Sequence, residues 1–194
     1  MMEALLELDQ TLFFWINNDW HNPFLDWLMP YWRNKYTWIP FYIFLLIFAL
    51  WKYRIRGLFF ILGLGATVAI SDPLSSELVK KNVERVRPCN DTTINESVLL
   101  LVRCGGGYSF TSSHATNHFA VAVFLILTLG RRFRKIKWPL FFWAATIALG
   151  QVYVGVHYPL DIIAGGLMGS AVGWLTAYLF NRYLGLEKTS TSIA

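Results

Sequence analysis

Five long apolar runs, separated by short polar segments, dominate this chain of 194 residues. A helix needs roughly 20 residues, at about 1.5 Å rise per residue, to cross a hydrocarbon core of about 30 Å. Runs that approach this length predict membrane spans over residues 38–51, 58–79, 114–129, 138–156 and 161–184. The expected fold is therefore an all-α integral membrane protein, in which residues 1–194 form one domain with about five transmembrane helices in a single bundle.

The amino-acid composition agrees with a membrane protein. Hydrophobic residues make up 55% of the chain and charged residues 15%, against about 25% charged in an average soluble domain. A formal net charge of +5 could suggest a nucleic-acid partner, but the basic residues stand in short clusters between apolar runs rather than along one soluble face. We therefore expect the lipid bilayer, and no nucleic acid, as the partner of this chain.

The basic clusters also predict the orientation of the spans. Lysine and arginine are concentrated in the cytoplasmic connections of membrane proteins, and here they follow the first, third and fifth predicted spans. This places the connection over residues 80–112 outside, in a protein of the cytoplasmic (inner) membrane whose site faces the periplasm or exterior. That outer connection also carries cations, so the inverted topology stays open as an alternative. The residues that predict the orientation are Lys52, Arg54, Arg56, Arg131, Arg132, Arg134, Lys135, Lys137, Arg182 and Lys188.

The N-terminal segment, residues 1–36, is a poor candidate for a span because it mixes leucine and aromatic residues with Glu3, Glu7 and Asp9. It also lacks the basic start and the small-residue cleavage site of a signal peptide. Tryptophan is enriched where a membrane meets water. We therefore expect interfacial helices, with an aromatic belt formed by Trp15, Trp20, Trp27 and Trp32.

Small residues recur in the second and fifth predicted spans, where they allow helix backbones to approach closely. We expect these faces to pack against neighbouring helices. The residues are Gly63, Gly65 and Ala66 in the second span and Gly165, Gly166, Gly169 and Gly173 in the fifth.

Cys89 and Cys104 are the only cysteines, and both fall in the predicted outer connection. An exterior location permits a disulfide, and closing a loop of about 15 residues stabilises a fold by roughly 3 kcal/mol in the chain-entropy model. Two free thiols in a cytoplasmic loop are the alternative. Metal binding is disfavoured because the sequence has no Cys-x-x-Cys spacing.

Three short polar groups lie at the ends of predicted spans, where ionisable residues are costly and usually mark function. The predicted topology brings all three to the outer face. Together they supply two cations, two histidines and a carboxylate, which is a set suited to phosphate chemistry. The groups are Lys80 with Arg87-Pro88, Ser112-Ser113-His114, and His157 with Asp161.

The second group opens the third span. Ser112 or Ser113 is expected to cap this helix, where free backbone N–H groups and the helix dipole favour an anion. His114 has no capping role, which favours a chemical one. His118 lies four residues further along the same helical face, so a metal site completed by the third group is an alternative. A histidine hydrogen-bonded to a neighbouring helix is the commoner situation at such a depth.

His157 and Asp161 turn the chain between the fourth and fifth spans. Asp161 can accept a hydrogen bond from one ring nitrogen of His157, which leaves the other nitrogen available as a nucleophile or base. A helix cap is the alternative role for Asp161. In the first group, Arg87 offers a planar fork to phosphate oxygens and Lys80 offers a point charge.

In order and spacing these residues resemble the three signature motifs of the type-2 phosphatidic acid phosphatase superfamily, the membrane lipid phosphate phosphatases. The matching stretches are Lys80-x6-Arg87-Pro88, Thr111-Ser112-Ser113-His114 and His157-x3-Asp161. The resemblance implies a metal-independent phosphatase with a phosphohistidine intermediate and no cofactor. It also implies roles for single residues: phosphate binding by Lys80, Arg87, Ser112 and Ser113, protonation of the leaving group by His114, attack on phosphorus by His157, and orientation of that histidine by Asp161.

Two positions depart from the family pattern. Thr111 and Ser113 stand where the family usually has proline and glycine, which keeps a small helix-opening segment. The larger departure is Gly150-Gln151-x5-His157, where the family has Ser-Arg-x5-His. Gln151 can donate a hydrogen bond to phosphate but carries no charge, and a charge-assisted bond contributes roughly 1.5 to 3 kcal/mol against about 1 for a neutral one. The candidates to replace the missing arginine are Arg85, Arg103 and Lys81.

The expected activity is hydrolysis of a lipid phosphate or diphosphate at the outer face of the membrane. Undecaprenyl diphosphate, phosphatidylglycerol phosphate and a lipid A phosphate all fit the resemblance, and the sequence does not rank them. Two other classes stay open. A lipid phosphotransferase would pass the phosphoryl group from His157 to another acceptor, whereas a non-catalytic lipid-binding or transport protein would tolerate the loss of His157.

Overall fold

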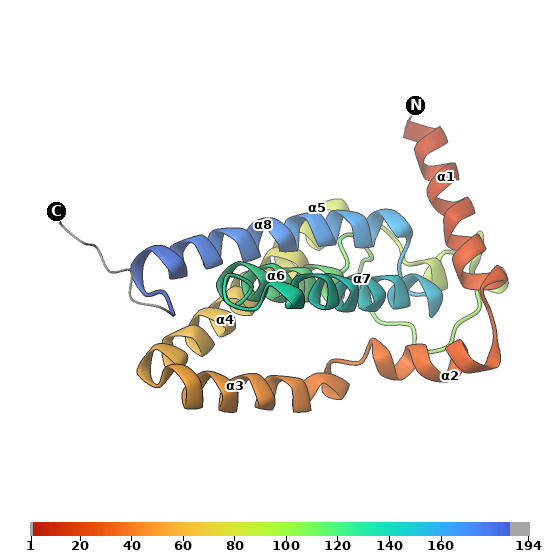
Figure 1. Ribbon diagram of the computed structural model, residues 1–194. Helices are drawn as coiled ribbons and strands as arrows, with labels where there is room; N and C mark the ends of the chain where they lie inside the picture. Colours follow the sequence, from red (N-terminus) through yellow and green to blue (C-terminus); the bar gives the residue numbers. More distant parts are fainter. Residues whose placement is uncertain (1, 187–194) are drawn as a thin grey trace.

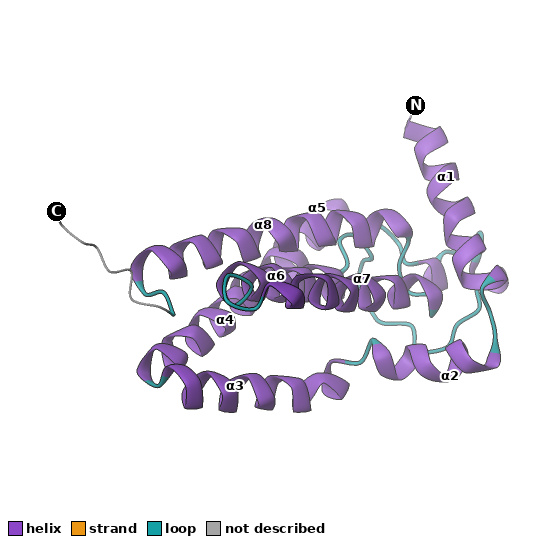
Figure 2. Ribbon diagram, viewed as in Figure 1, coloured by secondary structure: helices purple, strands orange, loops and turns teal. Residues whose placement is uncertain are grey.

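The computed structural model describes residues 2–186, and this part of the chain forms helices joined by loops, with no strand (Figure 2). The predicted cytoplasmic residue Lys188 lies outside the described residues. In chain order the α-helices are α1 (Met2–Phe14), α2 (Pro23–Trp32), α3 (Ile39–Tyr53), α4 (Ile55–Pro73), α5 (Lys80–Val83), α6 (Ser113–Thr128), α7 (Lys137–Tyr153) and α8 (Pro159–Tyr183).

The helices confirm the predicted all-α membrane fold. Three helical stretches of the described chain are long and apolar enough to cross a membrane, namely Lys35–Tyr53, Ile55–Val83 and Pro159–Tyr183. The other two predicted spans correspond to α6 and α7, which have 16 and 17 residues. The second span continues beyond its predicted end because Pro73 is followed by a π-helical turn, Leu74–Val79, that leads directly into α5. Proline has no backbone N–H for the helix ladder, and such a local widening accommodates it.

The long helices lie lengthwise in the molecule (Figure 1). Helices α6, α7 and α8 run side by side, α4 crosses behind them, and α3 forms the opposite edge. Helix α6 lies in the middle of this bundle and packs most extensively against α8. Helix α1 stands at a steep angle to the bundle, at the end where α8 begins.

Glycines of α8 allow its backbone to approach α6, as expected. A Cβ atom at Gly169 would lie 2.1 Å from the carbonyl oxygen of Thr116, and one at Gly173 would lie 2.3 Å from that of Ala120. Only glycine fits at these distances. The expectation was wrong for Gly65 in α4, because a Cβ there would meet nothing within 4 Å.

The N-terminal segment is fastened to the bundle by buried polar side chains. Asn17 is fully buried. Its Nδ2 donates to the carbonyl oxygens of Tyr153, at 2.8 Å, and Leu99, at 2.9 Å, and its Oδ1 accepts from the Leu99 N–H at 2.9 Å. Further along, the indole N–H of Trp32 donates to Thr146 of α7 at 3.0 Å. The segment before the first span is therefore positioned against the end of the bundle where α7 ends.

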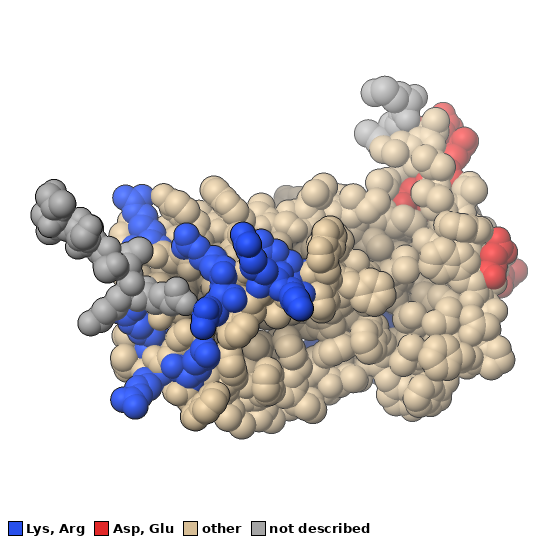
Figure 3. Space-filling view, viewed as in Figure 1, with Lys and Arg blue, Asp and Glu red and all other residues tan. Residues whose placement is uncertain are grey.

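On the face of the molecule drawn in Figure 3, the exposed basic and acidic side chains gather toward different ends. Lysine and arginine gather at the end formed by the α3–α4 turn, the α6–α7 connection and the C-terminal end of α8, whereas acidic side chains lie toward α1. The three polar groups identified in the sequence belong to the end near α1, because α6 and α8 both begin there.

Candidate active site

A tight turn between α7 and α8 places His157 and Asp161. The N–H groups of Val156 and His157 both donate to the carbonyl oxygen of Gln151, at 3.1 and 3.2 Å, and so close the end of α7. Gly155 has a φ of +85°, and a Cβ there would lie 2.8 Å from a Val98 methyl group, so this position requires glycine. The turn delivers the following residues to the start of α8.

Asp161 performs both of the roles that the sequence left open. Its Oδ2 accepts the Tyr158 backbone N–H at 2.9 Å, which caps α8 in a capping box. The same oxygen lies 3.3 Å from Nδ1 of His157. The carboxylate accepts a hydrogen bond from the Nδ1–H group, which leaves Nε2 as the basic nitrogen of the ring.

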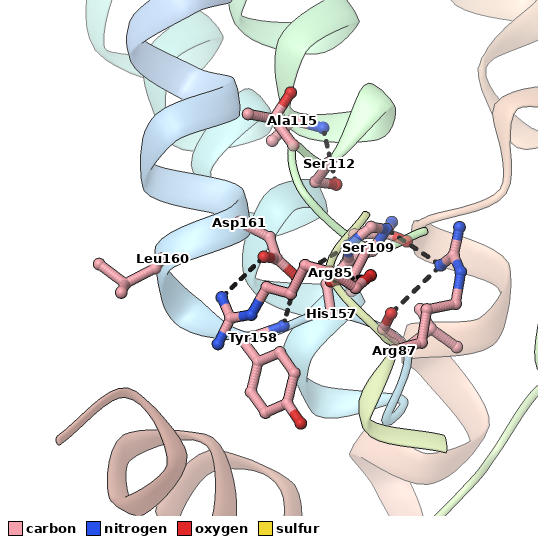
Figure 4. Close-up of polar contacts among 12 residues, drawn as sticks. Arg85, Arg87, Ser109, Ser112, Ala115, His157, Tyr158, Leu160 and Asp161 are labelled. Carbon is pink, nitrogen blue, oxygen red and sulfur yellow. Dashed lines mark hydrogen bonds and ion pairs between the residues drawn. The ribbon is translucent and has the colours of Figure 1, made fainter. Parts of the chain in front are cut away.

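Arg85 is the second partner of Asp161 (Figure 4). One terminal nitrogen of its guanidinium lies 2.9 Å from Oδ1 of Asp161, and the other lies 2.5 Å from Oδ2 of Asp9 in α1. Asp9 also accepts the Leu160 N–H at 2.8 Å. The guanidinium stacks 4.0 Å above the Tyr158 ring. Asp9 on α1 thus holds, through Arg85, the carboxylate that orients His157, and sequence reasoning missed this contribution of α1.

Arg87 lies on the other side of the His157 ring. Its terminal nitrogen Nη1 is 3.3 Å from Nε2 of His157 and donates to the Val156 carbonyl at 3.2 Å, and its Nε donates to the Gly107 carbonyl at 3.3 Å (Figure 4). The predicted disulfide between Cys89 and Cys104 is present, with the Cα atoms 6.0 Å apart, and the loop that it closes begins two residues after Arg87.

His157 is a buried neutral imidazole at pH 7. Its side chain is 2% exposed. The pKa of His157 is lowered to about 4, first by burial and then by the positive charges of Arg87 and Lys80, while the carboxylate of Asp161 acts in the opposite direction. A neutral imidazole with one nitrogen held by a carboxylate can act as a nucleophile.

Ser112 caps α6, as predicted, because its Oγ accepts the Ala115 N–H at 3.4 Å. Its own N–H donates to the Asp161 carbonyl at 3.0 Å, which ties the start of α6 to the start of α8. The Ser113 hydroxyl lies 3.1 Å from the Ser75 hydroxyl in the π-helical turn after α4. The second and third polar groups therefore meet directly.

His114 and His118 lie on one face of α6 with parallel rings whose centroids are 6.3 Å apart. Nδ1 of His118 lies 2.7 Å from the His114 carbonyl oxygen, and its ring packs edge-on against Trp143. His118 is thus a core histidine, but its hydrogen bond is to the backbone of its own helix and not, as expected, to a neighbouring helix. Among residues 2–186 no three His, Cys, Asp or Glu side chains are grouped so that they could hold a metal ion, so the alternative of a metal site on these two histidines finds no ligand set.

The position of the missing arginine has an unexpected neighbour. Gln151 is fully buried, and its Oε1 accepts two N–H groups of Arg33, from Nε at 2.9 Å and from Nη2 at 2.7 Å. Arg33 is the residue that ends α2. Two of the three candidates from the sequence are engaged with carboxylates: Arg85 with Asp9 and Asp161, and Lys81 with Glu77. The third, Arg103, lines the same cavity as Arg33.

That cavity, of about 1080 Å³, opens beside the polar groups. One part of its wall is polar and includes Arg33, Ser113 and His114. The rest is formed largely by apolar side chains of α3 and α4, among them Ile39, Ile43, Leu46, Ile61, Leu64 and Val68. A ligand with an anionic head and a hydrocarbon tail matches this division.

Comparisons with known proteins agree with the geometry. A family model described as the PAP2 superfamily matches residues 56–184. A lipid A 4'-phosphatase of Bacteroides thetaiotaomicron is 30% identical over 196 aligned positions, which cover 100% of this chain and 86% of that protein. An undecaprenyl-diphosphatase of Sulfolobus acidocaldarius is 35% identical, over 81% of this chain and 70% of that protein. The crystal structure of Aquifex aeolicus LpxE superimposes with a TM-score of 0.69 at 28% identity, covering 88% of this chain and 95% of LpxE.

Proposed function

The chain belongs to the PAP2 superfamily and is a membrane lipid phosphatase, and we propose that it hydrolyses a lipid phosphate or diphosphate through a phosphohistidine at His157, without a metal ion. The observation that carries this proposal is the arrangement around one imidazole. Asp161 lies at Nδ1, Arg87 lies at Nε2, and the ring is buried and neutral.

The mechanism uses two steps. Nε2 of His157 attacks phosphorus and forms a P–N bond, while the bond from phosphorus to the leaving oxygen breaks and His114 gives that oxygen a proton. A water molecule then attacks phosphorus and gives a proton to His114, the P–N bond breaks, and inorganic phosphate is released, which restores the neutral imidazole of His157 and the protonated His114. Lys80, Arg87, the hydroxyl groups of Ser112 and Ser113 and the free backbone N–H groups at the start of α6 would hold the phosphoryl oxygens, on which negative charge develops. Gln151 would contribute through Arg33, whose guanidinium it holds by two hydrogen bonds.

A lipid A phosphate is the first substrate to test. The relative named lipid A 4'-phosphatase aligns with the whole chain, whereas the undecaprenyl-diphosphatase aligns with 81% of it. The cavity supports a lipid in either case, because its apolar wall on α3 and α4 would receive a hydrocarbon chain next to the polar wall at His114. Undecaprenyl diphosphate and phosphatidylglycerol phosphate are the second and third candidates.

We place the site at the outer face of the cytoplasmic membrane, with α1 and α2 in the outer interface. The gathering of lysine and arginine at the opposite end of the molecule supports this orientation (Figure 3). In sealed membrane vesicles of known orientation, a short-chain lipid phosphate added outside should be hydrolysed in right-side-out vesicles only. Hydrolysis confined to inverted vesicles would reverse the topology.

Release of inorganic phosphate tests the activity. The purified protein should release phosphate from at least one of the three lipids, and EDTA should leave the rate unchanged. His157→Ala should lower the rate by more than about a thousandfold, because the covalent route is lost. Arg132→Ala, an exposed residue at the far end of the bundle, is the matched control and should keep the wild-type rate.

Three results would contradict parts of the proposal. Loss of activity in EDTA would overturn the metal-independent mechanism. Substantial activity in His157→Ala would mean that another residue is the nucleophile. Transfer of the phosphoryl group to a second lipid without release of free phosphate would identify a phosphotransferase, the alternative that the sequence left open.

A further inference from the structure

We infer that Arg33, from the segment before the first span, supplies the phosphate-binding guanidinium that the third motif lacks at Gln151. The inference rests on the proposed function, since it assigns a residue to the same site. It joins a residue and a motif that lie 118 positions apart in the chain. Gln151 would then be a positioning residue, which holds Arg33, rather than the group that binds phosphate.

The contact between the two side chains leaves Arg33 able to bind an anion. A guanidinium has five N–H donors, and Gln151 accepts two of them through a single oxygen. An amide is neutral, so this contact fixes the guanidinium without cancelling its charge. Within residues 2–186 no carboxylate forms an ion pair with Arg33, whereas the nearby Arg85 is paired with both Asp9 and Asp161. Arg33 therefore has the charge and the remaining donors that a phosphoryl group requires.

The surroundings of Arg33 place that charge at the site. Arg33 lines the same cavity as His114. Burial and the positive charge of Arg87 together lower the pKa of Arg33 to about 10, so the two guanidinium groups act on each other while Arg33 stays protonated at pH 7. Like charges brought together in a poorly solvated site repel each other, and a dianionic phosphoryl group would remove this repulsion.

If Arg33 had only a structural role, its loss would lower the stability of the fold rather than the binding of phosphate. The end of α2 is held to α7 independently of Arg33, through the hydrogen bond from Trp32 to Thr146 and the contact of Met29 at Gly150, where a Cβ would lie 3.6 Å from the methionine sulfur. Loss of the Arg33 charge should therefore change phosphate binding more than folding.

The test exchanges the two side chains. Arg33→Ala should lower kcat/KM for the lipid phosphate by about 10- to 100-fold, the range expected for one charge-assisted contact. Arg33→Lys should retain an intermediate rate, because a point charge replaces a fork. The double variant R33Q/Q151R carries the same two residue types in exchanged positions and should recover most of the rate that R33Q alone loses. Arg132→Ala is the control for loss of an arginine away from the site.

Orthovanadate, a phosphate analogue, separates this inference from the proposed function. Isothermal titration should show weaker vanadate binding by R33Q than by the wild type, with binding restored in R33Q/Q151R, even if no tested lipid is hydrolysed. Wild-type kcat/KM or wild-type vanadate affinity in R33Q would overturn the inference and leave the phosphatase intact. An exchange variant that folds, by its elution profile and melting temperature, yet recovers neither rate nor binding would also overturn it. If Arg33→Ala does not fold, the lysine and exchange variants decide.

Discussion

His157 obtains its properties from residues on three separate segments. Asp161 on α8 fixes one ring nitrogen, Arg87, just before the disulfide-closed loop, faces the other, and Arg85 joins Asp161 to Asp9 on α1. The carboxylate of Asp161 determines which nitrogen is basic, while burial and the positive charge of Arg87 keep the ring neutral. A nucleophilic histidine requires both conditions.

The pH dependence of kcat/KM follows from this environment. The reacting form of His157 is neutral, and its pKa is lowered from 6.5 to about 4. A lowered pKa means that the ring becomes protonated only at more acidic pH. Protonation of His157 should therefore reduce kcat/KM as the pH falls through about 4, rather than through about 6.5. Asp161→Asn removes a carboxylate that raises this pKa, so it should move the acid limb to still lower pH while reducing the rate.

The measurement is kcat/KM from pH 3.5 to 9 for the wild type and Asp161→Asn. Because phosphate monoesters themselves titrate near pH 6, a short-chain lipid diphosphate should be compared with a monophosphate to separate ionisation of the substrate from that of the enzyme. An enzyme limb centred at or above pH 6.5 with both substrates would contradict a buried, neutral His157.

Local patterns in the sequence predicted these residues unequally. Spacing alone predicted that His157 and Asp161 would meet, because a turn followed by a helix start brings residues four apart together. Ser112 was predicted to cap α6 for the same local reason. Arg33 and Asp9 carry no such pattern: their partners lie 118 and 76 positions away, and only the packing of α1 and α2 against the bundle brings them to the site.

At the scale of helices, hydropathy predicted the spans because burial in lipid is a property of whole segments. Their ends were less predictable. The second span continues through a π-helical turn after Pro73, and the fourth ends at Tyr153 rather than residue 156 because the turn containing Gly155 follows. Both irregular segments position the site: the first carries Ser75, which contacts Ser113, and the second leads directly to His157.

The α6–α8 contact can be tested by adding one methyl group. Gly169→Ala would place a Cβ 2.1 Å from the Thr116 carbonyl oxygen, so the helices must separate, and overpacking of this kind costs about 1 to 3 kcal/mol. We expect a lower melting temperature in detergent. The matched control is Gly65→Ala on α4, where a Cβ meets nothing within 4 Å and the melting temperature should be unchanged or higher. Equal melting temperatures for the two variants would show that this close contact does not support the fold.

Across the whole molecule, the site and the exposed cluster of lysine and arginine lie at opposite ends (Figure 3). The site forms where α6 and α8 begin, and α1, α2 and the disulfide-closed loop surround it, while lysine and arginine gather at the other end (Figures 1 and 3). The sequence predicted the bundle and this separation of charge. It did not predict that the N-terminal segment contributes to the site, because a segment with no span and no motif offers no local signal of its partners.

Identification of the covalent intermediate tests the central claim most directly. The protein should be mixed with a lipid carrying a radioactive phosphoryl group, quenched in alkali, which preserves phosphohistidine, and analysed by mass spectrometry. We predict that the phosphoryl group is found on His157, that it disappears in acid, and that it is absent in His157→Ala. Turnover with no phosphorylated protein, or with the group on a different residue, would contradict the account.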